Sequence, residues 1–120
     1  MRKIKFKAKQ LNSGEWFEGD LVHLGNRVCI GGDNIKDGIT DVDPETVCQF
    51  TGLKDCEGNE IWEGDIVERE IWNRLYNGLT KAKGVIEYKG AEFFVAINSE
   101  TYSLYPKDIK VVSNKFDKES

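Results

Sequence analysis

The sequence is poor in the residues that most often carry catalysis. It contains one histidine, His23, and no serine lies in a Gly-x-Ser-x-Gly motif, so a Ser-His-Asp hydrolase triad has no support. The three cysteines, Cys29, Cys48 and Cys56, lie 19 and 8 residues apart, which fits neither a disulfide framework nor a CxxC metal-binding motif. We therefore expect reduced thiols, no metal, no cofactor and no enzymatic activity.

Long apolar segments are also missing. No apolar run approaches the roughly 20 residues that span a membrane, and the basic segment 1–10 lacks the apolar stretch of a signal peptide. These absences favour a cytoplasmic protein that has no membrane partner.

Motifs for calcium and for phosphate are incomplete. Asp41, Asp43 and Glu45 alternate as carboxylates do in a calcium loop, but the glycine at the sixth position and the closing glutamate of an EF-hand are missing. The segment 31–33, Gly-Gly-Asp, is not followed by the Lys-Ser/Thr of a phosphate-binding loop. Neither segment predicts a ligand site.

Negative charge is concentrated in the middle of the chain. The first ten residues contain five bases and no acid, and residues 11–70 contain fifteen acids against four bases. Proteins that bind nucleic acid by neutralising phosphates usually present a basic face, so this distribution disfavours tight duplex binding. The alternative is a local basic patch formed by the first strand and the C-terminal third.

One octapeptide occurs twice. Residues 15–22, EWFEGDLV, return as residues 60–67, EIWEGDIV, with five identical positions and three exchanges between apolar residues. In each copy we expect an aromatic strand to run into a Gly-Asp turn, in which the glycine takes a positive φ and the aspartate bonds to the turn backbone. The residues concerned are Trp16, Gly19, Asp20, Trp62, Gly64 and Asp65.

The first half of the chain predicts a β-meander. Residues 3–9 alternate between apolar residues, which should face a core, and lysines, which should face water. The lysines are Lys3, Lys5, Lys7 and Lys9. This row either protects a sheet edge against aggregation or forms an electrostatic surface for single-stranded nucleic acid. Further strands are expected at 16–23 and 27–30, and the acidic segment 37–46, broken by Pro44, should be a connecting loop.

The second half predicts a small barrel. Residues 51–62 indicate a turn at Gly52 and a hairpin in which Gly58 takes the left-handed conformation. The segments that follow have the order found in an SH3-like barrel. They are a Gly-Asp-apolar string, a long loop, a hairpin, an aromatic strand, a 3₁₀ turn at Pro106–Asp108 and a final strand. We expect a mostly β protein with a β-meander at 1–50, the barrel at 51–113 and a polar tail at 114–120. The two parts should share one core and fold as a single unit.

Residues 68–80 are the one ambiguous segment. Ile71 and Leu75 lie four residues apart, and so do Trp72 and Tyr76, which is the spacing of a short helix. The same residues also fit a long hairpin that turns at Asn77-Gly78. These four side chains are more apolar than a solvated loop normally carries, so we expect them to contact a partner protein or a second copy of the chain.

Several motifs resemble those of the YopX family. They are TGLKD at 51–55, the string GNEIWEGDIV at 58–67, GEWFEGD at 14–20 and DPETV at 43–47. Cys48 and Cys56 stand where the family would be expected to have Gly or a polar turn residue, so neither resembles a functional position. The resemblance implies a protein of bacteriophages and prophages of Gram-positive bacteria, with a β-meander followed by an SH3-like barrel. It implies no established activity.

Two classes of function remain after these exclusions. The favoured one is a noncatalytic module that binds a protein partner or assembles with itself through exposed aromatics and sheet edges. The alternative is a nucleic-acid-associated accessory protein that uses the basic first strand and aromatic side chains of the barrel.

Overall fold

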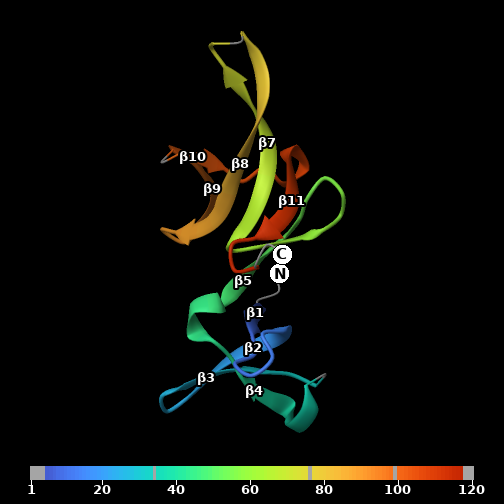
Figure 1. Cartoon of the computed structure of the whole chain (residues 1–120), viewed down its shortest axis with the longest axis vertical. Helices are drawn as coiled ribbons and strands as arrows, with labels where there is room; N and C mark the ends of the chain where they lie inside the picture. The colour runs from blue at the N-terminus through green and yellow to red at the C-terminus, as the bar shows by residue number, and fades with distance from the viewer. Residues whose placement is uncertain (1–4, 34, 76, 99, 118–120) are drawn as a thin grey trace. The chain divides into compact units, whose positions relative to one another are not determined.

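The computed structural model describes residues 5–33, 35–75, 77–98 and 100–117. The chain is built mostly from antiparallel strands, which confirms the expected fold class (Figure 1). It divides into two units, residues 1–50 and 51–120, which are described separately below.

The first unit is a sheet in which the strands pair in the order β4-β3-β2-β1-β5. Its strands are β1 (Phe6–Lys9), β2 (Trp16–Leu24), β3 (Arg27–Gly31), β4 (Ile39–Asp41) and the first part of β5 (Cys48–Lys54). Two 3₁₀ turns, η1 (Lys36–Gly38) and η2 (Pro44–Thr46), flank β4. The core is formed by Ala8, Ile30, Ile35 and Val42, against which Phe6, Phe17, Leu21, Val28 and Val47 pack.

Two predictions for this unit are wrong. The segment 37–46 is not only a loop, because Ile39–Asp41 pairs with β3; a three-residue strand is too short to show an alternating pattern in the sequence. The strand β1 does not protect an edge, because Phe6 and Lys7 pair with β2 on one side and with β5 on the other.

The two copies of the octapeptide fold differently. Gly64 lies between β6 (Glu60–Trp62) and β7 (Asp65–Asn73) with a φ of 86°, which is the expected turn. Gly19 lies inside β2 and is not among the glycines with positive φ, so the turn predicted there is wrong. A Cβ atom at Gly19 would collide with the carbonyl oxygen of Gly31 on β3. Glycine is therefore required at both positions, but for different reasons.

The second unit contains a five-stranded antiparallel sheet with the order β10-β9-β8-β7-β11. Besides β7, its strands are β8 (Gly78–Lys89), β9 (Glu92–Ile97), β10 (Glu100–Ser103) and β11 (Ile109–Asn114). The 3₁₀ turn η3 spans Pro106–Asp108, as predicted, and β6 pairs with β5. The core side chains are Ile61, Val67, Ile86, Val95, Ile97 and Ile109. That this sheet closes as an SH3-like barrel stays a prediction.

Two buried aspartates connect distant parts of the second unit. The carboxylate of Asp55 accepts hydrogen bonds from the backbone amides of Glu57, Asn59 and Val111 at 2.8–2.9 Å. Asp65 accepts one from the backbone amide of Trp62 at 2.8 Å and one from the side-chain amide of Asn114 at 3.0 Å. Each aspartate thus ties a turn near the start of the unit to β11, the last strand of the sheet.

The described residues of segment 68–80 form a hairpin, so the helical interpretation is wrong. Eight residue pairs join β7 and β8, from Ile66↔Val85 to Asn73↔Gly78, and Asn77 takes a φ of 49° in the turn. The pairs of β8 with β9 stop at Val85, and those of β7 with β11 stop at Arg69. The end of the hairpin therefore extends past the other strands of its unit as a two-stranded arm (Figure 1).

Candidate functional site

The end of the β7–β8 arm exposes three large apolar side chains, which we call the hairpin end: Trp72, Leu75 and Leu79. Trp72 is 60% exposed, Leu79 62% and Leu75 91%. Trp72 and Leu79 are directly paired across the two strands, so their side chains lie on the same face of the arm. Leu75 lies in the turn, where its backbone amide donates to the side-chain oxygen of Asn73 at 2.9 Å.

The predicted contact residues do not all belong to the hairpin end. Ile71 alternates with Trp72, points to the opposite face, and packs against the core cluster of the second unit. Tyr76 lies outside the described residues. Sequence reasoning missed Leu79, although the signal was present, because a turn at Asn77-Gly78 pairs residue 79 with residue 72.

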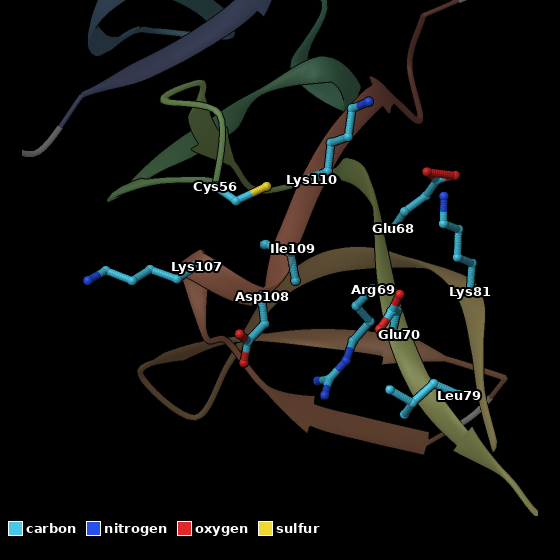
Figure 2. A pocket seen from close by; sticks show the side chains of 10 residues that line it. All are labelled: Cys56, Glu68, Arg69, Glu70, Leu79, Lys81, Lys107, Asp108, Ile109 and Lys110. Atoms are coloured by element: carbon cyan, nitrogen blue, oxygen red, sulfur yellow. The ribbon is translucent and has the colours of Figure 1, made fainter.

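Charged residues continue the same face of the arm toward the sheet. Glu68 and Glu70 lie on β7, and their cross-strand partners on β8 are Lys83 and Lys81. We call these four residues the charged face. Acids occupy one strand and bases the other, and Figure 2 shows the side chains of Glu68 and Lys81 directed toward one another.

A pocket of about 460 Å³ opens beside the charged face (Figure 2). Its lining comes from β7, β8, η3, β11 and the turn before β6: Cys56, Glu68, Arg69, Glu70, Leu79, Lys81, Lys107, Asp108, Ile109 and Lys110. The ammonium group of Lys110 lies 3.6 Å from the carboxylate of Glu57. The guanidinium carbon of Arg69 lies 5.1 Å from the centre of the Tyr102 ring, and its Nε has no hydrogen-bond partner among the described residues.

The lining of this pocket mixes charged groups with apolar surface. Acids and bases are mixed in its lining, which has no histidine. Among the described residues, no group of three or more His, Cys, Asp or Glu side chains is placed to hold a metal ion. The arrangement is able to form ion pairs and to bury apolar side chains.

Three lysines in β1 and just before it lie against aromatic rings. The ammonium group of Lys5 is 4.6 Å from the centre of the Phe50 ring and 3.6 Å from the carboxylate of Glu18. Those of Lys7 and Lys9 are 4.7 and 5.3 Å from the centre of the Trp16 ring. The side chain of Lys5 is only 18% exposed, so the prediction that it faces water is wrong. Lys3 lies outside the described residues.

Two of the three free cysteines are buried. Burial is the main cause that raises the pKa of the Cys29 thiol, and its hydrogen bond to Asp41, at 3.2 Å, raises it further. The pKa of Asp41 is lowered, chiefly because the guanidinium of Arg27 donates to the same oxygen at 2.8 Å. A thiol with a raised pKa holds less thiolate and is less reactive. The thiol of Cys48 donates to the backbone oxygen of Thr46, and Cys56 is exposed.

Comparison with known proteins identifies the family. The family model described as YopX protein matches residues 5–116 of the 120-residue chain. No curated protein matches the chain. No helix in the described part of the chain is long and apolar enough to cross a membrane. Because the family match extends over nearly the whole sequence, the chain belongs to the YopX family.

Proposed function

We propose that this protein is a noncatalytic, phage- or prophage-encoded accessory protein that acts in the host cytoplasm and binds another protein, or a second copy of itself, through the hairpin end. The observation that carries the proposal is the exposure of Trp72, Leu75 and Leu79 together at the tip of one arm. Single exposed apolar residues are common on protein surfaces, but a cluster of this kind is typical of a contact surface.

Energetics support this role for the arm. Complete burial of a Leu-sized side chain contributes roughly 1.5–3 kcal/mol, and aromatic residues are frequent anchors of protein interfaces. The charged face borders the tip on the side toward the sheet and provides polar groups of the kind that flank such anchors. Because the arm is held to the sheet by a continuous strand ladder, little ordering is needed when it binds.

The noncatalytic part of the proposal rests on the state of the nucleophiles and bases. Cys29 and Cys48 are buried, and the one histidine, His23, is an exposed residue of β2. The pocket lining contains one thiol, that of the exposed Cys56, and no histidine that could act as its base. Binding, rather than covalent chemistry, is what this lining supports.

A matched pair of leucine variants tests the proposal. Leu79, which is 62% exposed, lies at the hairpin end, whereas Leu11, which is 61% exposed, belongs to the first unit. Tagged parent, Leu79→Ser and Leu11→Ser proteins are used as bait in an extract of infected host cells. We expect the parent and Leu11→Ser to retain the same protein, and Leu79→Ser to lose it without a change in melting temperature. Equal capture by Leu79→Ser would refute the role of the hairpin end.

A further inference from the structure

The face of the arm that carries the hairpin end is complementary to itself. On this face β7 contributes Glu68, Glu70 and Trp72, and the residues paired with them on β8 are Lys83, Lys81 and Leu79. One strand is acidic, the other is basic, and both end in an apolar residue. A two-fold axis that lies between two such faces and runs parallel to the strands places β7 of one copy over β8 of the other. Every acid then meets a base.

We propose that two copies of this chain form a symmetric dimer through this face, with Trp72 packed on Leu79 of the partner subunit and Glu70 paired with Lys81 of the partner subunit. This inference rests on the proposed function and names the partner as a second copy. Two Trp72–Leu79 contacts form the apolar end of the interface at the hairpin tips, and the four acids and four bases of the two charged faces continue the interface toward the sheets. The pocket opens on this face, because Glu68, Glu70, Leu79 and Lys81 are part of its lining.

Charge disfavours the other symmetric arrangements. A two-fold axis perpendicular to the strands places β7 over β7, so that Glu68 and Glu70 face the same residues of the second copy. Edge-to-edge pairing of β8 with β8 brings Lys81 and Lys83 close to the same lysines. Juxtaposed like charges weaken an interface, whereas the arrangement whose axis runs parallel to the strands has none.

The exposure of Trp72 and Leu79 supports a second copy of the chain as the partner. The arm extends past the pairs that β7 makes with β11 and β8 with β9, and Trp72 and Leu79 remain 60% and 62% exposed in the single chain. The second unit itself therefore leaves Trp72 and Leu79 uncovered, whereas Glu68 lies further down the arm beside Lys110 of β11. The acids and bases of this face are complementary to a surface that has the same charge pattern. A second copy of the chain has that surface.

The experiment uses variants that alter the charge pattern. Glu68→Lys/Glu70→Lys makes the charged face all basic, and Lys81→Glu/Lys83→Glu makes it all acidic. We expect the parent to dimerise in sedimentation experiments, each variant alone to dimerise at least about tenfold more weakly, and their equimolar mixture to form a heterodimer. Glu15→Lys/Glu45→Lys changes the net charge as much as the all-basic variant does, but in the first unit, and should dimerise like the parent.

A variant that combines Glu68→Lys and Glu70→Lys with Lys81→Glu and Lys83→Glu keeps the test decisive if the all-basic arm does not fold. Carrying all four changes, it retains an opposite charge in every cross-strand pair and should dimerise with itself. It should not exchange subunits with the parent, because acid then faces acid and base faces base. Native mass spectrometry of the mixture gives the ratio of the two homodimers to the mixed dimer. A statistical mixture would overturn the proposed interface.

The outcomes separate this inference from the proposed function. A parent that stays monomeric at several hundred micromolar, yet captures a host protein in a Leu79-dependent way, overturns the dimer and leaves the proposed function standing. If neither dimerisation nor capture depends on Leu79, both are overturned. A dimer whose assembly follows the charge variants and Leu79→Ser supports both.

Discussion

Replacing Asp55 by alanine should destabilise the second unit strongly. This carboxylate belongs to the TGLKD motif, is 6% exposed, and accepts backbone hydrogen bonds from Glu57, Asn59 and Val111. The first two donors hold the turn that leads into β6, and the third belongs to β11. The substitution therefore removes the acceptor that joins the turn to the last strand of the sheet.

The magnitude follows from the surroundings of each donor. A hydrogen bond to a charged group contributes roughly 1.5–3 kcal/mol, and a buried donor that loses its partner costs about 1–3 kcal/mol. Glu57 and Asn59 are exposed, so water replaces the carboxylate at their amides at a small cost. Most of the lost free energy comes from the backbone amide of Val111, because its acceptor in the parent is the buried carboxylate. We expect Asp55→Ala to lower the free energy of unfolding by about 2–4 kcal/mol, which is a large part of the stability of a small domain.

The measurement is urea unfolding followed by tryptophan fluorescence, with Asp55→Asn as the comparison. Asparagine keeps one acceptor oxygen but turns an amide toward the donors, so its midpoint should lie between those of the parent and Asp55→Ala. A midpoint for Asp55→Ala equal to that of the parent would contradict the reasoning.

The same carboxylate gives a pH dependence. Burial raises the pKa of Asp55, but the hydrogen bonds from Val111, Asn59 and Glu57 together lower it by more, so the pKa in the folded state lies below the ordinary value. A carboxylate whose pKa is lowered by folding stabilises the fold fully at pH values above about 3.9, its pKa in the unfolded chain. That contribution is lost as the pH falls below this value. The parent should therefore lose more stability than Asp55→Ala between about pH 4 and pH 2.

Four further outcomes are expected. Gly64→Val should cost roughly 1–3 kcal/mol of unfolding free energy, because valine strains a backbone with a φ of 86°; an unchanged melting temperature would contradict this. Trp62→Ala, at a site only 4% exposed, should cost roughly 3–5 kcal/mol, and a parent-like urea midpoint would exclude a core role. Gly84→Ala should cost about 1–3 kcal/mol, because its Cβ would lie only 2.6–2.8 Å from atoms of β9; full stability in chemical denaturation would refute the close packing. Labelled single-stranded oligonucleotides should show no micromolar binding in fluorescence anisotropy at physiological salt, since Lys7 and Lys9 lie on an aromatic ring; tight binding that these lysines control would reverse the preferred function.

Turn chemistry was predictable from sequence because it depends on neighbouring residues. The positive φ of Gly58 and Gly64 and the 3₁₀ turn that begins at Pro106 follow from residue types that restrict or free the local backbone. Gly19 shows the limit of this reasoning. It has the same sequence neighbours as Gly64, but its conformation is set by the close approach of β3, which the octapeptide does not encode.

Strand pairing was less predictable because it joins distant residues. Alternation placed a strand at the start of the chain, but not its position between β2 and β5, so the prediction that its lysines protect a sheet edge was wrong. The bond from Val111 to Asp55 spans 56 positions and has no local signal.

At the candidate site, residue types were easier to predict than geometry. The unusual apolar content of segment 68–80 drew attention to Trp72 and Leu75, and both side chains are exposed in the structure. The helical spacing grouped Ile71 with them, whereas the hairpin directs it to the core and brings in Leu79 instead. Only the register of the two strands reveals that acids and bases are sorted onto opposite strands, because the pairs are between 11 and 15 residues apart.

The two bonds from β11 also affect how the protein is made on the ribosome. The donor for Asp55 is synthesised 56 residues after it, and the donor for Asp65 follows 49 residues after its acceptor. At about 5–20 residues per second, the first carboxylate waits roughly 3–11 s for its partner. During translation the nascent second unit holds two carboxylates that cannot be buried without cost, so it stays open until β11 has emerged. A premature stop codon before Ile109 would therefore yield a product that proteases recognise as unfolded, rather than a shortened but working protein.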